Sequence, residues 1–513
     1  MEERMKSKLG LFDAVIFAIG NMIGAGIFAL SGLTLRMAGT GALLSFLLTS
    51  TAAMFTGLSY AELNSITAKA GGGYSIINDT MHGIFGFLAG RRFRFGYTAS
   101  AVLYSLSFAR HFRLIYRANV IVVAVALIIL FYIINFFGAE SSSKAETVVV
   151  LTKLFALSLF IALSLRNFTP EALGGLTIDV IKIVGASSLV FIAFQGFDMI
   201  STMGEELRDA TRTIPRAMVI SIIIVTTIYE LVLLGILSAV PLDVIMHMSP
   251  EELETIVVQA AYTKRGRAME IIMITGAVVS AISAYNAAIF AASRVGYAMG
   301  RDGILPPSFG RIHPKTRVPH ISLTFSTATA ISLAMLMYFL GDKAISTMGY
   351  LSSLIFMAAF SLVNVSLIVH RRVYPNVRRP FKVPLYPVTP ILAILFLILF
   401  SSVMVRIDVV AATIFVVFTI GVIFYYYLGY EGARSLRDVI YITLRDIAMV
   451  TFKMKSRPKE VIRSVSPEEA LRKFLEEIDG AGAGIRTRDR GICSPALYQA
   501  ELPRLVKRTD LGL

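Results

Sequence analysis

The chain has 513 residues, of which 56% are hydrophobic and only 16% are charged, and its mean hydropathy is +0.71. This composition excludes a water-soluble globular protein, because ordinary cores could not bury so much apolar surface. The net charge of +15 does not indicate nucleic-acid binding, because the basic residues lie between apolar runs, where they set the topology of a membrane protein.

Long apolar runs predict twelve transmembrane helices and an all-α membrane protein, and they lack the alternation that a β-barrel needs. The predicted spans cover residues 11–35, 40–66, 83–109, 118–138, 145–166, 183–204, 216–240, 268–294, 320–340, 346–370, 388–405 and 409–429. An even number of spans puts both termini on one side. Lys and Arg are about twice as frequent in the segments that would share that side, which predicts cytoplasmic termini in a multi-pass protein of the cell membrane.

The first and sixth predicted spans are interrupted at mid-membrane depth. Gly20, Gly24 and Gly26 weaken the first span, and Gln195–Asp198 places a glycine and two polar groups in the sixth. The glycines alone could form a close helix-packing seam. Two interruptions five spans apart, however, are typical of a transporter that binds its substrate between broken helices.

Broken helices offer groups that suit an amino acid. A half-helix that starts inside the membrane presents free N–H groups to a carboxylate, and freed carbonyl groups suit an ammonium group or a cation. The aromatic side chains of Phe191, Phe194 and Phe197 could close over the bound molecule, although each of them could also be ordinary packing.

Several motifs occur in an order that resembles the amino acid–polyamine–organocation (APC) superfamily, over about residues 8–430. They are Gly24–Phe28, Ser59–Leu63, Phe194–Asp198 and Gly300–Pro306. The third span departs from the family pattern, because arginines stand where the family has aromatic residues. The resemblance implies a five-plus-five inverted-repeat (LeuT-type) core with two peripheral helices.

The resemblance also implies a function and a site. The chain would be a secondary active transporter that moves amino acids, with neutral ones favoured, by alternating access. The alternatives left open are an amino acid or polyamine exchanger of the same fold and, less favoured, a channel or a membrane enzyme. The expected substrate-contact residues are Ile23, Gly24, Ala25, Gly26, Ile27, Phe191, Ile192, Phe194 and, from its aromatic ring, Phe197. Phe191 would be an outer aromatic gate.

Lys153 lies inside the fifth predicted span, where an ionisable side chain is costly and points to a functional role. Burial disfavours the charged form of a lysine, so this group is a candidate for releasing a proton. The resemblance implies that its ammonium group binds carbonyl groups near Gly20 and Ile23, with hydroxyl groups from Ser280 or Ser283. Three alternatives remain. Lys153 could only reach towards the membrane interface, a sodium ion could take the place of its ammonium group, or Glu230 could be the proton carrier.

The tail, residues 431–513, is polar and is predicted to be a separate cytoplasmic segment after the transmembrane domain of residues 1–430. A capping-box pattern predicts an amphipathic helix at about 466–478, and the rest is expected to be disordered and without function. The single cysteine, Cys493, lies there, and the six histidines are scattered. The sequence therefore predicts neither a metal site nor a cofactor.

Overall fold

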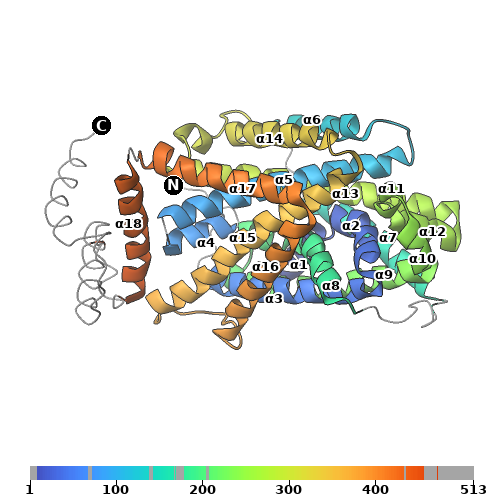
Figure 1. The fold of residues 1–513 in the computed structure, drawn as a ribbon, viewed down its shortest axis with the longest axis horizontal. Coiled ribbons are helices and arrows are strands. Elements are labelled where there is room, and N and C mark those ends of the chain that lie inside the picture. The colour runs from blue at the N-terminus through green and yellow to red at the C-terminus, as the bar shows by residue number, and fades with distance from the viewer. Residues whose placement is uncertain are drawn as a thin grey trace.

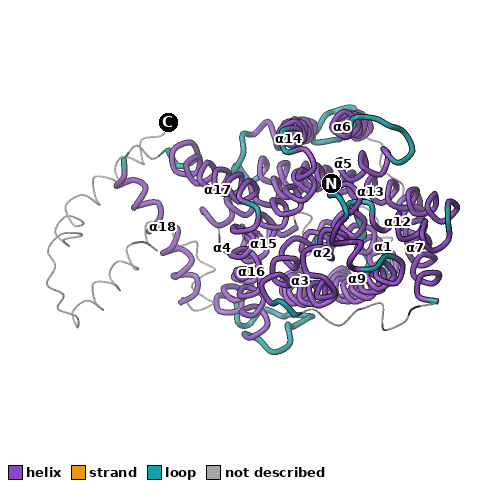
Figure 2. The backbone as a smooth tube through the Cα atoms, turned by 45° about the vertical axis from the view of Figure 1, so that its right-hand side comes forward, coloured by secondary structure: helices purple, strands orange, loops and turns teal. Residues whose placement is uncertain are grey.

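The computed structural model describes residues 9–66, 72–81, 83–137, 143–166, 168, 178–203, 207–432, 435–455 and 471. Over these ranges the chain is almost entirely helical, and the only β-pairing is an isolated bridge between Leu9 and Leu207. Figure 1 shows long helices bundled side by side, and Figure 2 shows that short loops connect them. The all-α prediction is therefore confirmed.

Each predicted span has a helical counterpart that begins and ends within seven residues of its expected limits. The spans are α1 (Leu11–Met22) with α2 (Ala25–Ala38), α3 (Ala42–Ile66), α5 (Gly83–Arg113), α6 (Val120–Phe136), α7 (Ser143–Leu165), α8 (Val180–Val190) with the 3-10 turns η3 (Phe191–Phe194) and η4 (Phe197–Met203), α9 (Ala210–Ala239), α13 (Arg267–Arg301), α14 (His320–Tyr338), α15 (Ala344–Val373), α16 (Val388–Ile407) and α17 (Val409–Phe424) with its π-helical end Tyr425–Tyr430. Among the described residues, nine helical segments are long and apolar enough to cross a membrane, and α1 and α6 are shorter apolar helices.

The third span, α5, is not one of those nine segments, yet it is an interior helix of 31 residues. It packs against α13, α14 and α15. Small residues permit this approach: a Cβ atom on Gly96 would lie 3.0 Å from the ring of Phe356. Arg91, Arg92 and Arg94 lie in the first half of α5, where Arg94 stacks over the rings of Phe309 and Phe325, and Arg110 and Arg113 lie in its last turn. Close packing of α5 therefore compensates for its low hydropathy.

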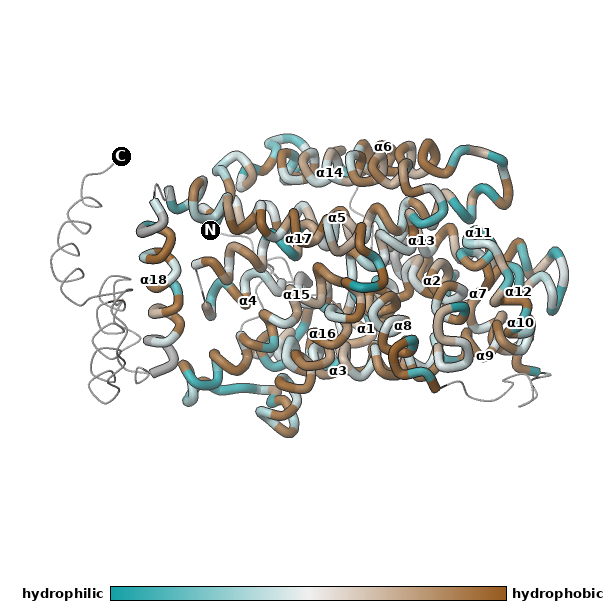
Figure 3. The backbone as a smooth tube through the Cα atoms, viewed as in Figure 1, coloured by the Kyte–Doolittle hydropathy of each residue, from teal (hydrophilic) through white to brown (hydrophobic). Residues whose placement is uncertain are grey.

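Apolar side chains are exposed on the outer helices, as lipid contact requires. Leu395 on α16 is 55% exposed, Val417 on α17 is 64% exposed and Phe155 on α7 is 64% exposed. Figure 3 shows that hydrophobic residues dominate α6, α16 and α17 at the surface of the bundle. Exposed apolar surface of this extent is not stable in water, so these faces contact the bilayer.

Short helices close the two ends of the bundle, and no long apolar run in the sequence predicts them. At one end lies α4 (Gly72–Met81), and at the other lie α10 (Leu242–His247), α11 (Pro250–Leu253) and α12 (Ile256–Arg265) (Figure 1). We call these the α4 end and the α12 end. Ser249 and Glu252 form a capping box that starts α11.

A further helix, α18 (Leu436–Lys455), crosses the α4 end of the bundle (Figure 1). Its buried Asp446 accepts the N–H group of Ile84 at 3.1 Å, which caps the start of α5. The start of α1 also lies at the α4 end (Figure 1). The first and the last helix of the described chain are therefore on the same side of the bundle. The amphipathic helix predicted at about 466–478 and the tail after it lie outside the described residues, apart from Leu471.

Candidate functional site

The first span is broken between α1 and α2. Ile23 and Gly24 leave helical geometry, with φ/ψ of −75°/69° and −92°/−152°. Their carbonyl groups and that of Gly20 therefore face side chains of other helices. A backbone group buried without a partner destabilises the fold, so these carbonyl groups need donors.

Lys153 and Ser280 supply those donors. Lys153 on α7 is fully buried, and its Nζ atom donates to the carbonyl oxygen of Gly20 and, at 2.9 Å, to that of Ile23. The hydroxyl group of Ser280 on α13 donates to the carbonyl oxygens of Ile23 at 2.7 Å and Gly24 at 3.1 Å. Ser283, one turn away, is half-buried and makes no hydrogen bond to these groups in the described part of the chain. The structure thus places Lys153, Gly20 and Ser280 together and leaves Ser283 aside.

The sixth span is broken after η3. Gly196 has φ +128°, and a Cβ atom there would lie 2.8 Å from the backbone of Asn21 and Met22, so the position requires glycine. The buried Asp198 accepts the N–H group of Gly196 at 3.1 Å and the hydroxyl group of Tyr97. The break is therefore stabilised by a carboxylate in the same segment.

The two breaks contact each other through their backbones. A Cβ atom on Gly26 would lie 2.8 Å from the Cβ atom of Ala193. The hydroxyl group of Tyr229 on α9 lies 2.7 Å from the carbonyl oxygen of Met22 and 2.9 Å from that of Ala193, and shares its proton between them. The glycines of the first span thus form a close packing seam and also accompany a break in the helix. The packing-seam interpretation and the broken-helix interpretation of these glycines are therefore compatible. No local sequence pattern singles out Tyr229, because an isolated tyrosine on an apolar helix is ordinary.

All nine predicted substrate-contact residues are buried, and the aromatic ones are divided between two clusters. The rings of Phe191 and Phe197 lie 6.1 Å and 5.5 Å from the ring of Phe360 on α15. The ring of Phe194 instead packs against Phe46 at 6.2 Å and Tyr229 at 5.2 Å. Phe360 was not predicted, although it forms the centre of the first cluster.

Free donors gather at the start of α2. This helix begins inside the bundle, and Gly24, the residue before it, has no side chain to cap its N–H groups. Two buried amide donors in the breaks, Nδ2 of Asn21 and Nε2 of Gln195, have no hydrogen-bond partner in the described part of the chain. Such groups favour an anionic ligand such as a carboxylate.

Ion pairs close the bundle at its α12 end. Arg110 on α5 contacts Glu251 and Glu254 at 2.6 Å each, and Gly32 on α2 packs against the backbone of Leu253. Burial raises the pKa of the Glu254 carboxyl group to about 7, and the nearby Arg110 opposes this rise. The cluster therefore loses negative charge as the pH falls below neutrality.

A second set of ion pairs closes the α4 end. The buried Glu62 on α3 accepts two hydrogen bonds from Arg371 at 2.7 Å and 2.5 Å, and Arg379 lies 3.2 Å away. These contacts join α3 to the end of α15.

Comparisons with known proteins agree with this architecture. Residues 9–431 match the amino acid permease family. The branched-chain amino acid permease BcaP of Bacillus subtilis is 28% identical over 428 residues, which cover 77% of this chain and 87% of the relative. The serine/threonine exchanger SteT of Bacillus subtilis is 24% identical over 407 residues, which cover 76% of this chain and 89% of the relative.

Among solved structures, the manganese transporter of Eremococcus coleocola superposes with a TM-score of 0.52 at 13% identity, covering 90% of this chain and 94% of that one. At this identity the likeness concerns the fold alone, and it supports the inverted-repeat prediction. The family and its relatives are transporters and not enzymes. With a match that extends over most of its length, the chain belongs to the amino acid permease family of the APC superfamily.

Proposed function

We propose that the chain is a secondary active transporter that carries neutral amino acids across the cell membrane by alternating access, driven by protons. The observation that supports this most directly is the position of Lys153, whose buried ammonium group joins α7 to the carbonyl groups of Gly20 and Ile23. A charged side chain at this depth in a membrane protein is energetically costly, so its presence points to a functional role.

The groups around the breaks suit a zwitterion. The uncapped start of α2 and the amide donors of Asn21 and Gln195 would receive the carboxylate. Carbonyl groups at the end of η3 would receive the ammonium group. Asp198 is already bound to Tyr97 and Gly196, so it does not offer a free carboxylate to a cationic side chain. This favours neutral amino acids over cationic ones.

Proton coupling would act through the contact between α7 and the first span. A charged Lys153 holds the carbonyl groups strongly, and a neutral amine holds them weakly. Release of the proton would therefore loosen α7 from α1 and permit the first span to move. Glu230 on α9 is the rival carrier, since its Oε1 atom is buried without a hydrogen-bond partner in the described residues. In this proposal both termini lie in the cytoplasm.

An exchanger is the second candidate function. The relative SteT is named a serine/threonine exchanger, and the same site can serve either mode. In an exchanger, uptake requires an amino acid inside the vesicle. In a proton symporter, an inward proton gradient alone is sufficient.

The test is an uptake screen in proteoliposomes that contain the full chain. The twenty amino acids, common polyamines and Mn²⁺ are each offered to empty and to amino acid-loaded vesicles, with and without an inward proton gradient. We expect accumulation of neutral amino acids in empty vesicles when the gradient is present. Uptake only into loaded vesicles would establish the exchanger, and failure of every amino acid would overturn the proposal.

A further inference from the structure

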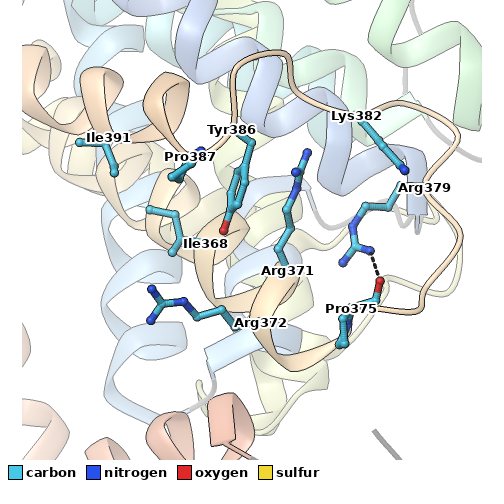
Figure 4. Close-up of a pocket in the computed structure, with 9 residues that line it drawn as sticks. All are labelled: Ile368, Arg371, Arg372, Pro375, Arg379, Lys382, Tyr386, Pro387 and Ile391. Carbon is cyan, nitrogen blue, oxygen red and sulfur yellow. Dashed lines mark hydrogen bonds between the residues drawn. The ribbon is translucent and has the colours of Figure 1, made fainter. Parts of the chain in front are cut away.

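A pocket opens at the α4 end of the bundle, between the last turn of α15, the loop after it and the first turn of α16. It has a volume of about 500 Å³. Figure 4 shows its lining, which consists of Ile368, Arg371, Arg372, Pro375, Arg379, Lys382, Tyr386, Pro387 and Ile391. Four of these nine residues are cations, and none is an acid.

Two of the four cations are held by the protein itself. Arg371 binds Glu62 and stacks over the ring of Tyr386 at 4.0 Å. Arg379 contacts Glu62 and donates to the carbonyl oxygen of Tyr374 at 2.7 Å. Their positions are therefore fixed whether or not the pocket is occupied.

The other two cations have no such role. Arg372 and Lys382 are exposed, and neither forms an ion pair with an acid among the described residues. Four positive charges stand against the one carboxylate of Glu62, which leaves a surplus of three in and behind the pocket. Such a surplus attracts an anion.

The pocket also has an apolar side that continues onto the lipid-facing surface. Ile391 is 44% exposed, and Leu395, one turn further along α16, is 55% exposed. Figure 4 shows Ile391, Pro387 and Ile368 together on the side of Arg372, with Lys382 across the pocket. A ligand that fits both sides has an anionic head and an apolar chain.

We propose that this pocket binds the phosphate-bearing headgroup of an anionic phospholipid from the leaflet at the α4 end. Basic pockets where transmembrane helices meet the membrane surface bind such headgroups. Arg372 and Lys382 attract the anionic headgroup from opposite sides of the pocket, and the first carbons of the acyl chains lie against Ile391. The proposal does not depend on which substrate the protein carries.

The bound lipid would stabilise the closed α4 end. The pocket is formed by the last turn of α15 and the loop after it, which place Arg371 and Arg379 on Glu62, so occupancy requires the closed arrangement of α3 and α15. A ligand that binds one conformation better shifts the population towards it. Anionic lipid should therefore raise the thermal stability of the protein.

The experiment measures lipid binding to the purified full chain by native mass spectrometry, and thermal stability by the monomer fraction that survives heating. The probes are phosphatidylglycerol, phosphatidylcholine with the same acyl chains, and inorganic phosphate. We expect phosphatidylglycerol to bind and stabilise the wild type more than the other two. The double variant Arg372→Gln/Lys382→Gln should bind phosphatidylglycerol about 30-fold more weakly, from the loss of two charges near the surface.

The matched control is Arg378→Gln/Lys315→Gln, which removes two exposed charges at the same end from residues that do not line the pocket. It should keep nearly wild-type binding. Equal losses in the two double variants, or equal stabilisation by the two lipids, would overturn the proposal. If inorganic phosphate stabilises as well as phosphatidylglycerol and competes with it, the ligand is a soluble phosphate and the lipid proposal is also wrong. Unchanged stability of both variants in phosphatidylcholine checks that they fold.

Discussion

The breaks in the first and sixth spans are stabilised by different kinds of partner. The carbonyl groups in the first break accept hydrogen bonds from Lys153, Ser280 and Tyr229, which lie on three other helices. In the sixth break, the N–H group of Gly196 donates to Asp198, two residues further along the same segment. The carbonyl groups of the first break thus depend on side-chain donors from other helices, whereas the N–H group of Gly196, at the turn of the sixth break, is satisfied within its own segment.

This difference indicates where a change of protonation would act. An ammonium group that loses its proton also loses most of its attraction for carbonyl oxygens, so the contact between α7 and the first span can be switched. The hydrogen bond between Gly196 and Asp198 does not involve Lys153. We therefore expect the first span to loosen against α7 during transport, while the turn in the sixth span keeps its shape.

Loss of the ammonium group should have the largest effect. In Lys153→Ala, the buried carbonyl group of Gly20 is left unpaired at about 1–3 kcal/mol, and that of Ile23 keeps only its bond from Ser280. We expect the initial rate of gradient-driven uptake into proteoliposomes to fall at least about 100-fold. Lys182→Ala is the control, because that side chain is 61% exposed and its one ion pair among the described residues is with Asp179. A Lys153→Ala protein that keeps the wild-type pH dependence would refute the switch.

A methyl group at Gly196 should have the next largest effect, on stability. In Gly196→Ala the new Cβ atom meets the backbone of Asn21 and Met22 at 2.8 Å, where a flexible side chain cannot give way. Gly266→Ala is the matched control, because it also has positive φ but nothing lies within 4 Å. Both variants bear backbone strain, so the difference between their stabilities isolates the cost of the steric collision. We expect this difference to be about 1–3 kcal/mol. Equal thermal stability of the two variants would mean that the breaks do not touch.

The spans and their interruptions could be predicted because each depends on a local pattern. Apolar runs of bilayer length predict the spans, and Gly24 or Gly196 in such a run predicts a break. The partners of the breaks could not be predicted in this way. Tyr229 contacts Met22 across 207 positions of sequence, and no local property of α9 indicates which of its residues faces the break. The short helix α11 and the amphipathic α18 were missed because neither contains a long apolar run.

Neutralising Asp198 should have a smaller effect that leaves the pH dependence intact. In Asp198→Asn the amide oxygen can still accept the N–H group of Gly196, but the amide nitrogen cannot accept the hydroxyl group of Tyr97. We expect a loss of about 1–2 kcal/mol in thermal stability. Tyr97→Phe should lose a similar amount, and the double variant should lose less than the sum, since both remove one contact. Loss of pH dependence in Asp198→Asn would instead make this carboxylate the switch.

The smallest effect should come from Ser280→Ala, which also resolves a choice that the sequence left open. Ser280 and Ser283 are three residues apart and share one side of α13, so the sequence could not tell which of them faces the first break. In the structure Ser280 donates to the carbonyl groups of Ile23 and Gly24, and Ser283 does not contact them.

In Ser280→Ala the carbonyl group of Ile23 keeps its bond to Lys153, and the loss that is not replaced is the longer contact of 3.1 Å to the carbonyl group of Gly24. We expect a change of about 0.5–1.5 kcal/mol, seen as a roughly 3- to 10-fold slower gradient-driven uptake. Ser283→Ala should transport at the wild-type rate. The opposite order of the two variants would mean that α13 is rotated in the transporting protein, and the first break would then depend on Lys153 and Tyr229 alone.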